Sequence, residues 1–213
     1  SSAEKDSGKL LLNLINQKQP HNAIHIGSEN FFLIECLCKA MDLVEESLLT
    51  IIPTYSNLDK VSDSLFEALN QLANKFPVET LKIPADKVLP DFYFQQQQID
   101  FALLQPAFSF EQALVAFYYL DKMLLAGGCI VIPNANAPVM KRLCRQLIWE
   151  HGYVLHQENI KTQKTPLLTK AIRLGLKNVP KPVKNRLQDW IHPDVLNTEK
   201  QLNLSADLVI LTK

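Results

Sequence analysis

Short apolar segments alternate with longer amphipathic segments along most of this chain, and this alternation restricts its fold more than any other feature of the sequence. The spacing predicts seven strands, at residues 22–26, 48–52, 78–83, 99–105, 129–132, 152–156 and 208–211. Around them, apolar side chains recur every three or four residues, which predicts helices at residues 10–15, 31–41, 61–76, 110–125 and 138–151. Strands that alternate with helices form crossover units. We therefore expect an α/β fold with a doubly wound, mainly parallel seven-stranded sheet and helices on both faces.

The length and composition fit one such domain. The chain has 213 residues, of which 47% are hydrophobic, and this is enough to bury a substantial core in a single α/β domain spanning residues 1–213. No apolar run approaches the roughly 18–20 residues that a membrane-spanning helix needs. The four cysteines lack the spacing of a zinc site or a disulfide framework. We interpret them as small packing residues in a reducing cytoplasm: Cys36, Cys38, Cys129 and Cys144.

The net charge of zero hides a basic segment near the carboxyl end. Between Lys161 and Arg186 the chain has eight lysines and arginines and no acidic residue. Apolar residues at helical spacing accompany the first part, so we expect a basic helical insertion at about residues 161–190, between the last two strands. It could dock on an anionic membrane surface or an acidic protein, cover the active site, form a homodimer contact or remain a solvated face. Base-stacking aromatic residues are missing until Trp190, which argues against nucleic acid as a partner.

The first strand runs into a turn that contains a single glycine. Gly27, Ser28 and Glu29 connect this strand to the next helix. Such a unit is typical of nucleotide-binding sheets, because glycine lets the backbone approach a ligand closely. The same residues also suit an ordinary turn in which Ser28 helps to cap the helix. His25, near the end of the strand, could bind a ligand carboxylate, act in proton transfer near neutral pH, or simply be held by a backbone group.

Three segments together resemble the class I S-adenosylmethionine-dependent methyltransferases, in particular the small O-methyltransferase-like members. An apolar helix at residues 10–15 leads to the strand and turn at Gly27. The segment Asp100–Leu104, with a helix after it, resembles the fourth strand of that family. The segment Leu124–Ile132 resembles the family's leucines, paired glycines and apolar strand. The resemblance covers about residues 8–156 and the last strand, and it implies a Rossmann-like methyltransferase fold with S-adenosylmethionine as cofactor.

The resemblance also implies a cofactor site at the carboxyl ends of the strands. Gly27 and Ser28 would contact the methionine part of S-adenosylmethionine, and Asp86, after the third strand, would lie near the adenine. The family usually has an acidic residue at the position of His25, and further glycines where Glu29 stands. The cofactor-binding candidates are His25, Gly27, Ser28, Glu29, Pro53, Thr54, Asp86 and Gln105.

Acidic residues that the family uses elsewhere are replaced in this chain. Pro53 and Thr54 stand where an acid commonly binds the ribose hydroxyls. Gln105 and Asn134 stand near the positions where metal-assisted members hold a divalent cation, and hard cations prefer carboxylate oxygens, so we expect no metal. Gln105 and Asn134 could instead orient a substrate through neutral hydrogen bonds, or be ordinary polar residues at strand ends.

These observations lead to competing functional hypotheses. The first is a metal-independent methyltransferase that uses S-adenosylmethionine and a small or medium-sized acceptor, with no catalytic base that the sequence identifies. The second is a catalytically inactive methyltransferase-like protein that binds a partner through its basic segment, and the replaced acids and glycines favour it. A third is a different nucleotide-binding protein that uses the same edge of the sheet.

Overall fold

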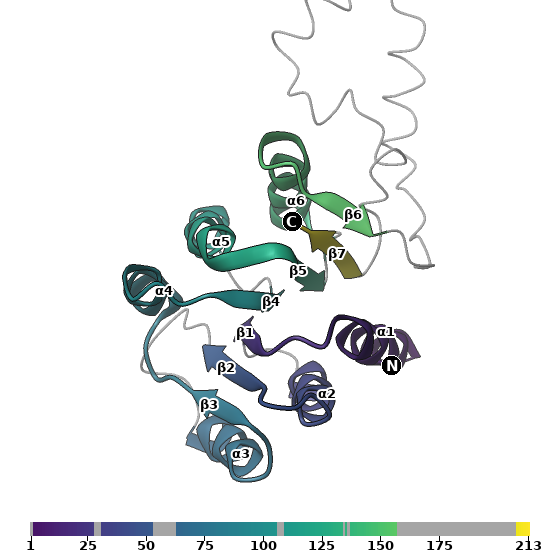
Figure 1. Ribbon diagram of the computed structural model, residues 1–213, viewed down its shortest axis with the longest axis vertical. Coiled ribbons are helices and arrows are strands. Elements are labelled where there is room, and N and C mark those ends of the chain that lie inside the picture. Colours follow the sequence, from purple (N-terminus) through teal and green to yellow (C-terminus); the bar gives the residue numbers. More distant parts are fainter. Residues whose placement is uncertain are drawn as a thin grey trace, which may run out of the picture.

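Seven strands form one sheet at the centre of the molecule (Figure 1). The computed structural model describes residues 2–27, 31–52, 63–105, 109–133, 135, 137–156 and 208–213. Its strands are β1 (Asn22–Ile26), β2 (Leu48–Ile52), β3 (Val78–Thr80), β4 (Ile99–Leu104), β5 (Leu124–Pro133), β6 (Val154–His156) and β7 (Leu208–Thr212). Their order is β3-β2-β1-β4-β5-β7-β6, and β7 is antiparallel to both of its neighbours while the other pairs are parallel. The predicted seven-stranded, mainly parallel sheet is confirmed.

Helices cover both faces of this sheet (Figure 1). They are α1 (Ser2–Lys18), α2 (Phe31–Met41), α3 (Asp63–Ala73), α4 (Ala85–Phe94), α5 (Phe110–Met123) and α6 (Pro138–Glu150). Successive strand residues point to opposite faces. Ile24 and Ile26 therefore join the core under α4, α5 and α6, whereas Ala23 joins the core under α1, α2 and α3. Burial of these two apolar layers is the main favourable contribution to the stability of the fold.

The strand order reverses beside β1. From β1 the chain moves outward through β2 to β3, and then returns across the sheet to β4 on the other side of β1. The carboxyl ends of β1 and β4 are aligned, since Ile26 pairs with Leu104. In open α/β sheets, ligands bind in the crevice outside the carboxyl ends of the strands at such a reversal. The fold therefore places Gly27 and Gln105, which follow these two strands, at the expected position of a ligand site.

Several predicted boundaries were wrong. Helix α4 was not predicted, because its sequence contains Pro90 and follows a predicted strand at residues 78–83 that ends at Thr80 in the structure. The helix predicted at residues 10–15 is longer and begins at Ser2.

The glycine turn predicted before the fifth strand lies inside β5. Ile99 pairs with Leu124, but Phe101 pairs with Cys129, so residues 125–128 of β5 bulge out opposite one residue of β4. Gly127 has φ of 82° within this bulge. A bulge of this kind lets the turn and the strand occupy the same segment.

All four cysteines are free, and Cys38, Cys129 and Cys144 are buried. Burial raises the pKa of each of these three thiols to about 12, which keeps them protonated and unreactive at neutral pH. Their interpretation as packing residues is confirmed. In the part of the chain that the structure describes, no helix is long and apolar enough to cross a membrane. The predicted basic insertion at residues 161–190 lies outside the described residues.

Candidate functional site

Gly27 occupies a backbone conformation that other residues rarely adopt. Its φ is 134°, and a Cβ at this position would lie 2.5 Å from the Cβ of Gln105. Its backbone N–H donates a hydrogen bond to the carbonyl of Ile52, at 3.0 Å. Glycine is therefore required here both by the backbone angle and by the close approach of the neighbouring strand end. These two reasons hold with or without a cofactor.

Gln105 follows β4 and packs against Gly27. Its backbone N–H donates to the carbonyl of Ile26 at 2.8 Å, which extends the pairing of β1 and β4 by one residue. The side chain is only 3% exposed. Its Oε1 atom has no hydrogen-bond partner among the described residues. A buried amide oxygen without a partner costs free energy, roughly 1–3 kcal/mol, that a ligand donor would recover.

His25 is completely buried near the end of β1. Its Nδ1 lies 3.2 Å from the carbonyl oxygen of Leu103. A carbonyl can only accept, so Nδ1 carries the proton, and Nε2 becomes an acceptor that has no partner among the described residues. Burial lowers the pKa of His25 to about 4, against a smaller raising effect of the backbone at Leu103 and Gly27. The ring is therefore neutral at pH 7.

The carboxyl ends of β1 and β4 thus carry two buried, neutral acceptors, Gln105 Oε1 and His25 Nε2, near a glycine with positive φ. Such a set suits a ligand with hydrogen-bond donors, such as an ammonium group, better than it suits a phosphate or a hard cation. Across the described ranges, no three histidine, cysteine, aspartate or glutamate side chains gather into a group that could hold a metal ion.

The other predicted site residues are less well placed or lie outside the described structure. Asp86 is in the first turn of α4 and is exposed. Among the described residues it has no hydrogen bond or ion pair with His25, Gly27 or Gln105. The remaining candidates lie outside the described residues: Ser28, Glu29, Pro53, Thr54 and Asn134.

Thr80, the last residue of β3, was missed by the sequence interpretation. Its Oγ1 is a third buried polar atom without a described partner at the carboxyl ends of the strands. A polar residue at the end of a strand is the signal that could have found it. It was hidden because we predicted that this strand would continue to residue 83.

Asp100 has a structural role at the opposite edge of the sheet. Its Oδ2 accepts a hydrogen bond from the backbone N–H of His21 at 2.8 Å, and its Oδ1 accepts one from the backbone N–H of Asn22 at 3.0 Å. The carboxylate therefore fixes the start of β1 against the start of β4. This gives a structural reason for an acidic residue at the second position of β4. The resemblance seen in the sequence included Asp100 in the matching segment but assigned it no role.

Comparisons with known proteins agree with this architecture. No protein-family model and no curated protein matches the sequence. Among solved structures, precorrin-6y C5,15-methyltransferase from Geobacter metallireducens GS-15 is 13% identical, with a TM-score of 0.55 over 76% of this chain and 80% of that chain. The N-methyltransferase NodS from Bradyrhizobium japonicum is also 13% identical, with a TM-score of 0.54 over 78% and 90%.

A third solved structure was determined with the cofactor. The O-methyltransferase TomG from Streptomyces achromogenes, in complex with S-adenosylmethionine, is 17% identical, with a TM-score of 0.52 over 71% of this chain and 73% of that chain. Identities this low establish the fold and nothing finer. The fold is that of the class I S-adenosylmethionine-dependent methyltransferases, which confirms the resemblance seen in the sequence at the level of architecture.

Proposed function

We propose that this chain of methyltransferase fold binds S-adenosylmethionine in the crevice between β1 and β4 and transfers its methyl group to a small or medium-sized acceptor without a metal ion. One observation carries the proposal. The buried Oε1 of Gln105 lacks a described partner at the point where the strand order reverses. Proteins seldom leave such an atom unsatisfied unless a ligand or water completes it.

The described residues fit the methionine part of this cofactor. Its ammonium group has three donors, and Gln105 Oε1 and His25 Nε2 are buried acceptors near the carboxyl ends of the paired strands β4 and β1. Gly27 lets Gln105 pack directly against the turn, because a Cβ at residue 27 would lie 2.5 Å from the Cβ of Gln105. In other proteins of this fold an acidic residue accepts hydrogen bonds from the cofactor. We propose that the neutral side chains of Gln105 and His25 accept them here.

Positioning is the main task left to this chain. S-adenosylmethionine supplies an electrophilic methyl group when it is bound, so alignment with the acceptor and exclusion of water account for most of the required chemistry. His25 is a poor general base at neutral pH, because its pKa is about 4 and its Nδ1–H already donates to Leu103. We therefore assign to His25 an orienting role rather than proton transfer.

Calorimetric titration with S-adenosylmethionine and S-adenosylhomocysteine tests the proposal. Saturable heat and a rise in melting temperature are expected for both, since a ligand that binds only the folded state stabilises it. Gln105→Leu should weaken S-adenosylmethionine binding about tenfold, because a hydrogen bond to a charged group is lost. The same change should leave the free protein as stable or more stable, since Oε1 has no described partner to lose.

Gln71→Leu is the matched control. Gln71 is exposed on α3, so the same substitution there should change neither property. No heat and no thermal shift at millimolar concentrations of either compound would exclude the methyltransferase proposal. Equal binding by wild type and Gln105→Leu would keep a cofactor site but remove Gln105 from it.

A further inference from the structure

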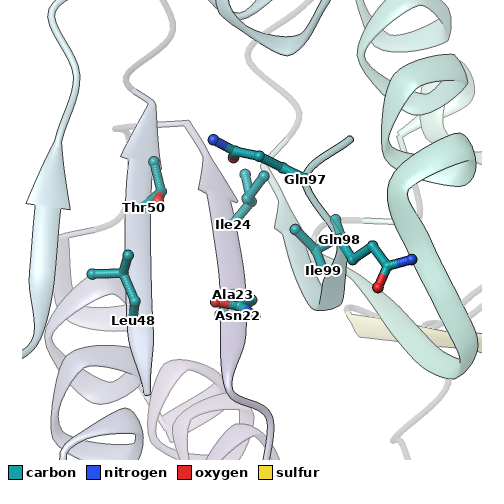
Figure 2. Close-up of a pocket in the computed structure, with 8 residues that line it drawn as sticks. All are labelled: Asn22, Ala23, Ile24, Leu48, Thr50, Gln97, Gln98 and Ile99. Carbon is teal, nitrogen blue, oxygen red and sulfur yellow. The ribbon is translucent and has the colours of Figure 1, made fainter. Parts of the chain in front are cut away.

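A cavity lies at the edge of the sheet opposite Gly27 and Gln105, by the amino ends of β1, β2 and β4 (Figure 2). Its volume is about 300 Å³, at the lower end of the roughly 300–1,000 Å³ that small-molecule sites occupy. Ile24 of β1, Leu48 of β2 and Ile99 of β4 supply apolar walls. No residue of this cavity belongs to the proposed cofactor crevice, so the inference does not depend on the proposed function.

The crossover from β3 to β4 explains the cavity. Helix α4 makes this crossover with ten residues, a length of about 15 Å, and its Val88 and Leu89 join the core on this face of the sheet. The helix ends at Phe94, and the four glutamines that follow return the chain to β4. The cavity lies where this glutamine turn meets the amino ends of β1 and β2.

The glutamine turn has a fixed backbone. Gln96 has φ of 59° and donates its N–H to the carbonyl of Tyr93 at 3.0 Å. The N–H of Gln97 donates to the carbonyl of Phe92, also at 3.0 Å. Figure 2 shows the Gln97 side chain reaching from this turn across β1, with its amide end toward β2, where Thr50 lies. The exposed side chain of Gln97 thus extends over β1 from a turn with a defined backbone.

The polar groups of this cavity are all uncharged. Thr50 is the lining residue with a hydroxyl, and no ionisable residue is among those that line the cavity. The lining residues with an amide side chain are Asn22, Gln97 and Gln98. A charged ligand would lose hydration here without gaining a compensating partner. Gln97 Nε2 donates one hydrogen to Gln95 Oε1 at 3.4 Å. Its second N–H and its Oε1 offer a donor and an acceptor side by side, which match the same pair on another amide or on the edge of a nucleobase.

We infer that this cavity binds a small, uncharged, planar molecule that carries an adjacent hydrogen-bond donor and acceptor, such as an aromatic carboxamide or a free pyrimidine base. The apolar walls contact the flat faces of the ring. Gln97 pairs with the donor and acceptor, and Thr50 supplies a further hydrogen bond at the β2 end. The bound molecule contacts β1 and β4, the same two strands that carry Gly27 and Gln105 at their other ends.

Two pairs of probes test the inference on the full chain. Nicotinamide and nicotinate differ mainly by a neutral amide against a carboxylate, and uracil and orotate differ by an added carboxylate. In titrations followed by calorimetry and ligand-observed NMR, at least one neutral probe should bind saturably and its charged counterpart at least tenfold more weakly. Thr50→Val and Gln97→Leu should each weaken the neutral probe about three- to tenfold, as expected for one lost neutral hydrogen bond.

Gln71 lies on α3 and is not one of the residues that line the cavity. Gln71→Leu therefore serves as the control and should bind the probe as wild type does. The inference is overturned if neither neutral probe binds at millimolar concentration. It is also overturned if charged and neutral probes bind alike, or if Thr50→Val and Gln97→Leu both keep wild-type affinity while remaining folded by circular dichroism.

Discussion

The polar side chains at the two edges of the sheet differ in whether they have hydrogen-bond partners among the described residues. At the amino edge, Asp121 accepts a hydrogen bond from the hydroxyl of Tyr153 at 2.8 Å and lies 3.4 Å from the ammonium of Lys213. At the carboxyl edge, Gln105 and His25 each keep one buried atom without a described partner. An unsatisfied buried group costs roughly 1–3 kcal/mol. Internal pairing therefore serves folding at the amino edge, whereas the described residues of the carboxyl edge leave two buried acceptors without a donor.

Two threonine hydroxyls lack described partners, and they lie at different edges of the sheet. Thr80 Oγ1 follows the pattern, since it is unpartnered among the described residues at the carboxyl end of β3. Thr212 Oγ1 is also without a described partner, yet it lies at the amino edge, where Thr212 pairs with Cys129 and Val154. A hydroxyl rotates freely and presents a small polar surface. The difference between the edges therefore rests on the amide and the imidazole.

Gly27→Ala should have the largest effect on stability. The new Cβ would lie 2.5 Å from the Cβ of Gln105, which belongs to a strand end and cannot turn away as a flexible side-chain tip can, and the φ of 134° is strained for alanine. Overpacking and backbone strain each cost about 1–3 kcal/mol. We expect a loss of about 4 kcal/mol in the free energy of unfolding, measured by urea denaturation.

Gly127→Ala separates the two causes. Gly127 also has positive φ, at 82°, but a Cβ there meets nothing within 4 Å. Only strain is introduced, so we expect a loss of about 1 kcal/mol. If the two variants are equally destabilised, then the close approach of Gln105 is not what demands glycine at the carboxyl edge.

His25 should make stability fall in mild acid. Its pKa is about 4 in the folded protein, well below the ordinary histidine value of 6.5 that the unfolded chain retains. The unfolded chain therefore binds more protons between these two values, and stability rises with pH there. As pH falls from 6.5, this contribution is lost progressively, and the loss levels off below pH 4. The full loss is about 3 kcal/mol, measured by urea denaturation at a series of pH values.

Replacement of the imidazole isolates this effect from the titration of carboxylates. His25→Gln should lack the extra loss between pH 6.5 and 4, whereas His21→Gln, at the exposed start of β1, should retain it. Identical pH profiles for wild type and His25→Gln would mean that His25 is not held neutral. The contrast between the edges would then rest on Gln105 alone.

The fold was largely predictable because its signals are local and repeated. Buried parallel strands such as Leu48–Ile52 are continuous apolar runs, and their spacing reflects the crossover helices. Helix α4 was not predicted, because Pro90 weakened the helical pattern and the short preceding strand weakened the strand pattern. The β5 bulge escaped because register is a relation between two strands, and the sequence of one strand does not contain it.

The site residues remain predictions, because the sequence indicates which residues end the strands but not what their side chains contact. The strand ends and the turn at Gly27 selected His25 and Gln105 as candidates, and both lie near the carboxyl ends of β1 and β4. Their missing partners depend on burial and on distances of a few tenths of an ångström between distant segments. The amino-edge roles of Asp100 and Asp121 were missed for the same reason, since their partners are 79 residues away for His21 and 32 residues away for Tyr153.

Tyr153→Phe should have the smallest effect and should act at the amino edge alone. Burial tends to raise the pKa of Asp121, but the hydrogen bond from Tyr153 and the charge of Lys213 outweigh it and hold the pKa below its usual value. A lowered carboxyl pKa stabilises the fold above the unfolded value, and this contribution is lost as pH falls through the folded value. Without the hydroxyl, Asp121 keeps Lys213, so we expect a loss of only about 1 kcal/mol at pH 7, with a weaker decline in acid than wild type shows.

Tyr118→Phe provides the comparison for this last variant, because Tyr118 is 51% exposed on α5 and its hydroxyl can bond to water. We expect its free energy of unfolding to match that of wild type. If Tyr153→Phe is equally silent, the internal hydrogen bonds of the amino edge contribute nothing measurable. The absence of described partners at Gln105 and His25 would then no longer distinguish a ligand site from an ordinary strand end, and only the titration with S-adenosylmethionine would decide between them.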